Sequence, residues 1–221
     1  MATVRRLYIY LVSAISLQSS VWAVIALLRN LLIPSLDAPT TTLAFEIAVI
    51  IIGLPIFLVH WLWGQRLAAQ QTEEAEAGLR RFYLYATLAG FLGPLLANIY
   101  TLLAHWFTGH PADWEPLGTQ GGTVWYTLAA VLPLAIFWGY HQRQLTADQY
   151  KIPDQGTNAS FQRIYRFGFS AAGMVMLTWG SIHLLRRLLY LFPSTGYEIH
   201  SPGYSEPGYA AASVLVGMGT W

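Results

Sequence analysis

The 221-residue sequence contains no cysteine. This absence excludes disulfide bonds, thiolate metal sites, iron–sulfur clusters and thiol nucleophiles. Charge is scarce as well, because only 10% of the residues are Asp, Glu, Lys or Arg, against about 25% in soluble domains. A water-soluble fold of this size has too much surface to cover with so few charges. A net charge of +1 without any basic run also argues against a nucleic-acid binder.

Sequence motifs for catalysis are missing too. The chain has no His-Glu-x-x-His, no Gly-x-Ser-x-Gly and no glycine-rich loop of the kind that holds phosphate. We therefore predict no catalytic residue, no metal site and no enzymatic activity.

Apolar residues are abundant instead. They make up 55% of the chain, mean hydropathy is +0.42, and nine Trp and thirteen Tyr are suited to anchoring helices at a bilayer surface. A transmembrane helix needs roughly 20 mainly apolar residues. This predicts an all-α integral membrane protein with five full spans and a partial sixth, at 7–32, 43–64, 82–107, 122–141, 164–192 and 208–221. The last segment is too short to cross a bilayer at about 1.5 Å per residue, so we expect a truncated sequence, or a half-helix held by a partner.

One sequence element occurs three times. Residues 5–10 (RRLYIY) return as 80–85 (RRFYLY) and, more loosely, as 162–167 (QRIYRF). The second helix repeats as well, with Pro55 and Pro133 at the same depth. Self-similarity at a fixed period indicates a copied unit. We predict tandem repeats of a two-helix transmembrane hairpin, 1–75, 76–153 and 154–221, the last with an incomplete second helix. Because each unit has two spans, the copies are expected to be parallel.

Basic residues are distributed unevenly between the two sides. The N-terminus and the loops after the second and fourth spans carry nine of the twelve, whereas the other three loops have none. These nine are Arg5, Arg6, Arg66, Arg80, Arg81, Arg143, Lys151, Arg163 and Arg166. Since cytoplasmic loops retain basic residues, we predict a cytoplasmic N-terminus. The acidic segment 73–76 between two of these arginine groups is expected to be a solvated linker with local charge balance.

Arg29 and Glu46 are charged residues near the outer ends of the first two spans. They are expected at similar depth across a short hairpin, and Ala104 and Val124 replace both together in the second repeat. We predict a structural ion pair. Snorkelling of Arg29 to the outer interface and a ligand or ion site are the alternatives.

Three histidines lie within the predicted spans. His105 and His183 fall toward the outer side, and His60 lies toward the cytoplasmic side beside two tryptophans. An imidazole in a membrane can serve as an axial ligand of haem or of a bacteriochlorophyll, so all three are candidate cofactor ligands. The alternative role is packing at the interface.

Small residues also recur along the spans. Ser16 and Ser20 are four residues apart on one helix face, and Gly173 and Gly180 lie in the fifth span. Small side chains allow helix backbones to approach closely in lipid. We therefore predict close helix packing at these positions.

Residues 5–13 (RRLYIYLVS), the Leu-Leu-Arg ending at 27–29 and the segment from Leu54-Pro55 to Trp63 carry a family resemblance. Over nearly its whole length, the chain resembles a bacterial family of tandem two-helix membrane repeats of unknown function, associated with green non-sulfur bacteria. The resemblance implies the fold and no established activity. It implies the bacterial cytoplasmic membrane, and an accessory subunit of a photosynthetic or respiratory complex.

The sequence therefore favours a non-enzymatic scaffold or accessory subunit of a larger membrane complex. Its expected partners are membrane lipids and other membrane subunits, without nucleic acid. A pigment- or haem-binding subunit and a small-molecule carrier are the alternative functions.

Overall fold

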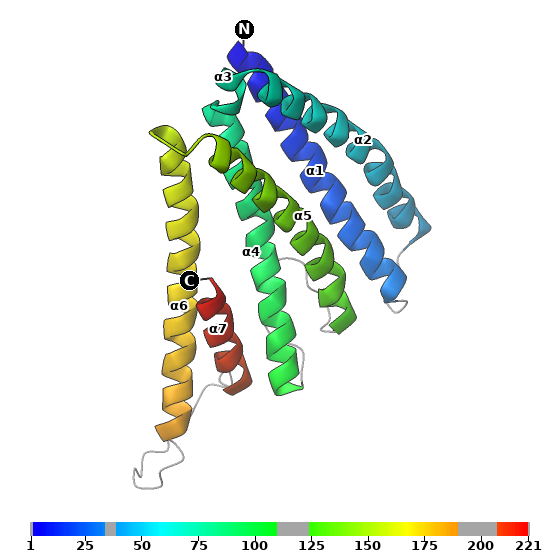
Figure 1. Cartoon of the computed structure of the whole chain (residues 1–221). Helices are drawn as coiled ribbons and strands as arrows, with labels where there is room; N and C mark the ends of the chain where they lie inside the picture. The colour runs from blue at the N-terminus through cyan, green and yellow to red at the C-terminus, as the bar shows by residue number, and fades with distance from the viewer. Residues whose placement is uncertain (1, 34–38, 110–123, 190–206, 221) are drawn as a thin grey trace. The chain divides into compact units, whose positions relative to one another are not determined.

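The computed structural model describes residues 2–33, 39–109, 124–189 and 207–220. Within these ranges the chain forms helices and no strand (Figure 1). The helices are α1 (Ala2–Leu32), α2 (Thr40–Gln70), the short α3 (Thr72–Ala75), α4 (Gly78–Thr108), α5 (Val124–Lys151), α6 (Thr157–Leu189) and α7 (Pro207–Gly219).

Five of these helices, α1, α2, α4, α5 and α6, are long and apolar enough to cross a membrane. This confirms the all-helical fold, and the number of helices that could cross a membrane equals the number of full spans predicted from hydropathy. The helices run past the predicted spans at their basic ends, since α2 continues to Gln70 and α5 to Lys151. The reason is that Gln, Arg and Ala are good helix formers, so the helix continues after the apolar run has ended.

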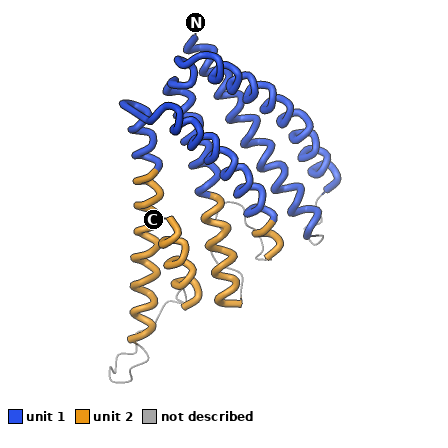
Figure 2. The backbone as a smooth tube through the Cα atoms, in the orientation of Figure 1, with its two compact units in different colours: residues 1–93, 129–165 blue, residues 94–128, 166–221 orange. Residues whose placement is uncertain are grey.

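The chain divides into two compact units (Figure 2). Unit 1 consists of residues 1–93 and 129–165, and unit 2 of residues 94–128 and 166–221. Helices α4, α5 and α6 each contribute to both units. The boundary therefore runs through helices, and the hairpin boundaries predicted from the repeat remain a prediction.

Helices α1 and α2 of unit 1 pack through small residues. The Ser20 hydroxyl donates a hydrogen bond to the Ser16 carbonyl of the same helix at 2.7 Å, so the hydroxyl needs no partner from another helix. Gly53 of α2 lies against this position, because a Cβ atom there would come within 2.5 Å of Ser20 Oγ. The predicted close approach at Ser16 and Ser20 is confirmed.

Helices α6 and α7 of unit 2 pack through glycine. Gly173 and Gly180 are the buried residues of α6. A Cβ atom on Gly180 would come within 2.6 Å of the Ala210 carbonyl oxygen, and one on Gly217 within 2.6 Å of the Gly173 carbonyl oxygen. Only glycine, which has no Cβ atom, fits at these positions. The sequence analysis predicted close packing at Gly173 and Gly180.

Candidate functional site

The basic ends of the unit 1 helices hold a set of ion pairs, of which the first involves α1. Glu74 of α3 receives hydrogen bonds from both Arg5 and Arg6, the latter from Nε at 2.8 Å. Its side chain is only 4% exposed, although Arg5 is 38% exposed. The expectation of a fully solvated acidic linker is therefore wrong for Glu74, because two guanidinium groups compensate its burial.

Arg80 at the start of α4 forms the second pair. Its Nε donates to Asp148 Oδ2 at 2.8 Å, its Nη2 to Gln65 Oε1 at 3.0 Å and its Nη1 to the Tyr10 hydroxyl at 3.4 Å. The guanidinium carbon also lies 5.8 Å from the ring centroid of Trp61, within cation–π range. Arg80 is 1% exposed, and groups from α1, α2 and α5 contact its guanidinium.

Arg81 forms the most deeply buried pair. Its Nε lies 3.1 Å from Asp154 Oδ1, and the two side chains are 1% and 2% exposed. Arg81 Nη2 donates to the Ile152 carbonyl at 2.7 Å. The other carboxylate oxygen of Asp154 accepts hydrogen bonds from Tyr85 at 2.6 Å and Gln149 at 2.8 Å. Oδ2 of the carboxylate is therefore hydrogen-bonded, whereas Oδ1 and Arg81 Nε make no hydrogen bond among the described residues and interact as an ion pair.

Two histidine–tyrosine pairs lie further along the same helices. His60 places Nδ1 2.8 Å from the Ile56 carbonyl and Nε2 3.3 Å from the Tyr8 hydroxyl. His141 repeats this arrangement, with Nδ1 2.9 Å from the Phe137 carbonyl and Nε2 3.5 Å from the Tyr83 hydroxyl. Because a carbonyl only accepts, Nδ1 carries the proton in the neutral imidazole and Nε2 accepts from tyrosine.

Aromatic rings surround His141, and two of them, Trp61 and Phe91, are buried. His141 is fully buried, and its ring centroid lies 5.6 Å from that of Trp61, 5.9 Å from that of Phe91 and 5.2 Å from that of Tyr140. The indole of Trp61 donates to the Tyr140 hydroxyl at 2.7 Å. These contacts join α2, α4 and α5 into a single core next to Arg80. Such a core fixes the position of the His141 ring.

Comparison with known proteins identifies a family for most of this unit. The family described as "Domain of unknown function (DUF5671)" matches residues 6–140, more than half of the chain. The chain belongs to this family. No curated protein and no solved structure matches it.

The DUF5671 segment contains four of the five residues predicted for a site. Arg29 and Glu46 are both buried, at 8% and 6% exposure. The Glu46 carboxylate accepts hydrogen bonds from the Asn30 amide at 2.9 and 3.1 Å. Asn30 is a partner that the sequence analysis did not identify, and the Arg29–Glu46 ion pair stays a prediction.

The predicted histidines do not share one environment. His60, within the DUF5671 segment, is satisfied by Ile56 and Tyr8. His105, in the same segment, and His183, outside it, each have a buried Nδ1 atom without a hydrogen-bond partner among the described residues. The His183 ring lies 4.7 Å from that of Trp179. Cofactor ligation by these three residues stays a prediction. In the described part of the chain, no group of three or more His, Cys, Asp or Glu side chains is arranged to hold a metal ion.

The sequence analysis missed His141 and the acids Asp148 and Asp154, which lie just beyond the DUF5671 match. His141 stands at the polar end of a predicted span, where an interfacial residue is expected. The two acids lie 68 and 73 residues from their arginines in sequence. A signal for these partners was present in the sequence. The Arg-Arg pair recurs at 5–6 and 80–81, and each pair is followed by an acid, Glu74 or Asp154, after the second helix of its hairpin.

Proposed function

We propose that this chain is a non-enzymatic membrane protein that acts as a scaffold or accessory subunit of a larger complex in the bacterial cytoplasmic membrane, with its N-terminus in the cytoplasm. The observation that carries the proposal is the open surface of α6. This helix has 33 residues, and its buried ones are the two glycines against α7. Phe167, Val175 and Trp179 are 71%, 68% and 64% exposed. A continuous surface of this kind suits a neighbouring transmembrane helix.

Unpaired charge on α6 supports a protein neighbour over lipid alone. Arg163 and Arg166 are exposed, and neither makes an ion pair with another described residue. Arg163 occupies the repeat position of Arg6 and Arg81, and each of these two binds a carboxylate, Glu74 or Asp154, that follows the second helix of its hairpin. A partner helix ending in an acidic residue would give α6 the same contact.

A parallel repeat of two-helix hairpins is part of this proposal. It is supported by the two equivalent histidine–tyrosine contacts, Tyr8 with His60 and Tyr83 with His141. The tyrosines occupy the same position of the repeated hexapeptide. The histidines do not align, since His141 lies about one helical turn beyond the position equivalent to His60, so the contact is kept while its sequence position shifts.

Photo-crosslinking in cells would test the proposal. A benzophenone amino acid in place of Phe167 is expected to give a protein adduct of discrete mass, because a partner covers this surface. Ile51 of α2, which is 65% exposed, is the matched control position for the benzophenone amino acid on a different helix. The complex should also migrate above the mass of the chain in mild detergent. Failure to recover any protein adduct at Phe167 in intact membranes contradicts the scaffold proposal.

Pigment or haem binding is a second candidate, favoured by the unpartnered Nδ1 atoms of His105 and His183. With Nδ1 buried, Nε2 would be the nitrogen that ligates an iron or magnesium centre. Protein purified from its native membrane would then show a Soret or near-infrared band that is lost on His105→Ala or His183→Ala. A spectrum without either band contradicts this candidate.

A further inference from the structure

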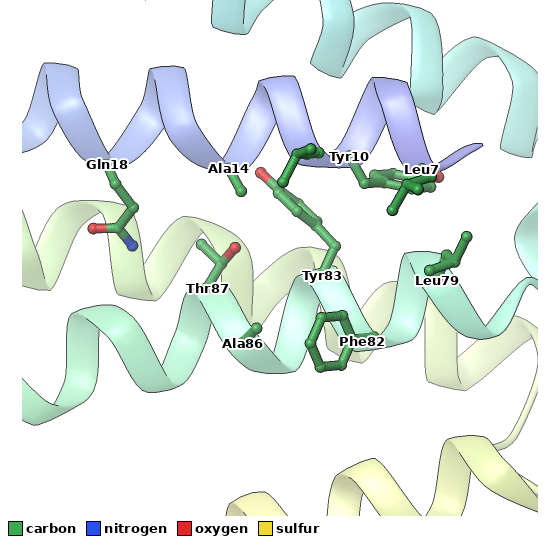
Figure 3. Close-up of a pocket in the computed structure, with 10 residues that line it drawn as sticks. Leu7, Tyr10, Ala14, Gln18, Leu79, Phe82, Tyr83, Ala86 and Thr87 are labelled. Carbon is green, nitrogen blue, oxygen red and sulfur yellow. The ribbon is translucent and has the colours of Figure 1, made fainter. Parts of the chain in front are cut away.

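A cavity of about 230 Å³ lies between α1 and α4 in unit 1 (Figure 3). Five of its lining residues belong to α1, from Leu7 to Gln18, and five to α4, from Leu79 to Thr87. Eleven residues of helix correspond to roughly 16 Å of length. The cavity is thus a slot along two helices, within the part of the chain that is apolar enough to span a bilayer.

The slot is open to the membrane. Leu7, Leu11 and Phe82 line it and are 52%, 53% and 53% exposed. A molecule dissolved in the bilayer can therefore enter it sideways. None of the lining side chains carries a charge at neutral pH, so the slot has no counter-ion for an anionic or cationic head group. Its ligand is consequently neutral.

One end of the slot contains a polar group without a partner. The half-buried Gln18 side chain makes no hydrogen bond to another described residue and lies about halfway along α1. In the apolar interior of a bilayer, an amide without a hydrogen-bond partner is unfavourable. Figure 3 shows it pointing from α1 toward α4, with Thr87 on the opposite wall.

Gly90 of α4 creates the space for this amide. A Cβ atom at position 90 would lie 2.8 Å from Gln18 Nε2. The amide is therefore held over a glycine, with Tyr83 and Phe82 supplying aromatic rings along the same wall. The wall combines a donor that has no acceptor with flat apolar surfaces.

We propose that this slot binds a neutral, membrane-dissolved molecule with a carbonyl on a ring, the chemistry of a quinone head group. Gln18 Nε2 donates to the carbonyl, the rings of Phe82 and Tyr83 pack against the head group, and an apolar tail leaves past Leu7 and Leu11. The assignment goes beyond the scaffold function and does not depend on it, since α6 contributes none of the lining residues.

Titration calorimetry on the full chain in detergent, with two matched probes, tests the assignment. The probes are a decyl-substituted benzoquinone and decylbenzene, which has the same tail and no carbonyl. The quinone is expected to bind at one site with an affinity about five- to tenfold higher than that of decylbenzene, the factor for about one net hydrogen bond. Equal affinities, or no binding of the quinone, would overturn the proposal.

Three variants locate the site. Gln18→Leu is expected to weaken quinone binding about tenfold and to leave decylbenzene binding unchanged. Ala86→Phe fills the slot and is expected to abolish binding of both probes. Ser19→Leu, one residue from Gln18 and outside this slot, should leave both affinities unchanged. Size-exclusion profiles identify any variant that fails to fold. An unchanged quinone affinity in folded Gln18→Leu refutes the site.

Discussion

Removing the carboxylate of Asp154 tests whether the buried ion pairs of unit 1 stabilise the fold. The Asp154→Asn change leaves the Arg81 guanidinium, which is 1% exposed, without a counter-charge 3.1 Å away. Breaking a buried pair by removing one partner costs about 3–5 kcal/mol of unfolding free energy. We therefore expect a clear fall in the midpoint of thermal or denaturant unfolding in detergent. Arg163→Gln on exposed α6 is the control, and should change the unfolding free energy by no more than about 0.5 kcal/mol.

A double-mutant cycle distinguishes loss of the pair from general damage. Replacing both partners, Arg81→Met with Asp154→Leu, removes both buried charges and should recover much of the stability lost in Asp154→Asn. If the two positions show no coupling, or if Asp154→Asn unfolds at the same midpoint as Arg163→Gln, the buried pair contributes nothing and the reasoning is refuted.

Three further predictions concern helix packing, charge and topology. Gly180→Leu should displace α7 and lower the unfolding midpoint, because its side chain would meet the Ala210 carbonyl, whereas Gly168→Leu, where a Cβ meets nothing within 4 Å, should not. If Glu46 pairs with Arg29 as predicted, Glu46→Gln should lower stability in detergent by about 3–5 kcal/mol, and Arg29→Ala with Glu46→Val should recover much of it. Additive effects in the double-mutant cycle would rule out the predicted Arg29–Glu46 ion pair. A reporter fused after Gly109 should read as external, and a cytoplasmic signal there would reverse the orientation.

The spans could be predicted from sequence because hydropathy over about 20 residues depends only on local composition. The ends of the helices could not, since polar helix formers continue α2 and α5 beyond their apolar runs. The small-residue contacts were predictable in kind, as at Gly173 and Gly180, because close packing in lipid needs small side chains.

The partners of the buried arginines in unit 1 could not be predicted from the local sequence. Arg80 and Arg81 read as loop residues that mark the cytoplasmic side, and nothing in their neighbourhood identifies Asp148 or Asp154 as their partners. His141 read as a polar residue at a span end, although the fold buries it completely. Pairings across some 70 residues depend on how the hairpin closes, and this information is not local.

The ion pairs also imply an order of events during synthesis. Arg81 emerges from the ribosome 73 residues before Asp154, and Arg5 emerges 69 residues before Glu74. At about 5–20 residues per second, each arginine remains without its carboxylate for roughly 4–15 s. With the cytoplasmic N-terminus proposed above, this uncompensated charge would hold the segment on the cytoplasmic face during that interval. Once the acid arrives, the Arg81 charge is buried with it, whereas Arg5 binds Glu74 and stays 38% exposed. We therefore expect substitutions at these arginines to separate into early defects of orientation and late defects of assembly.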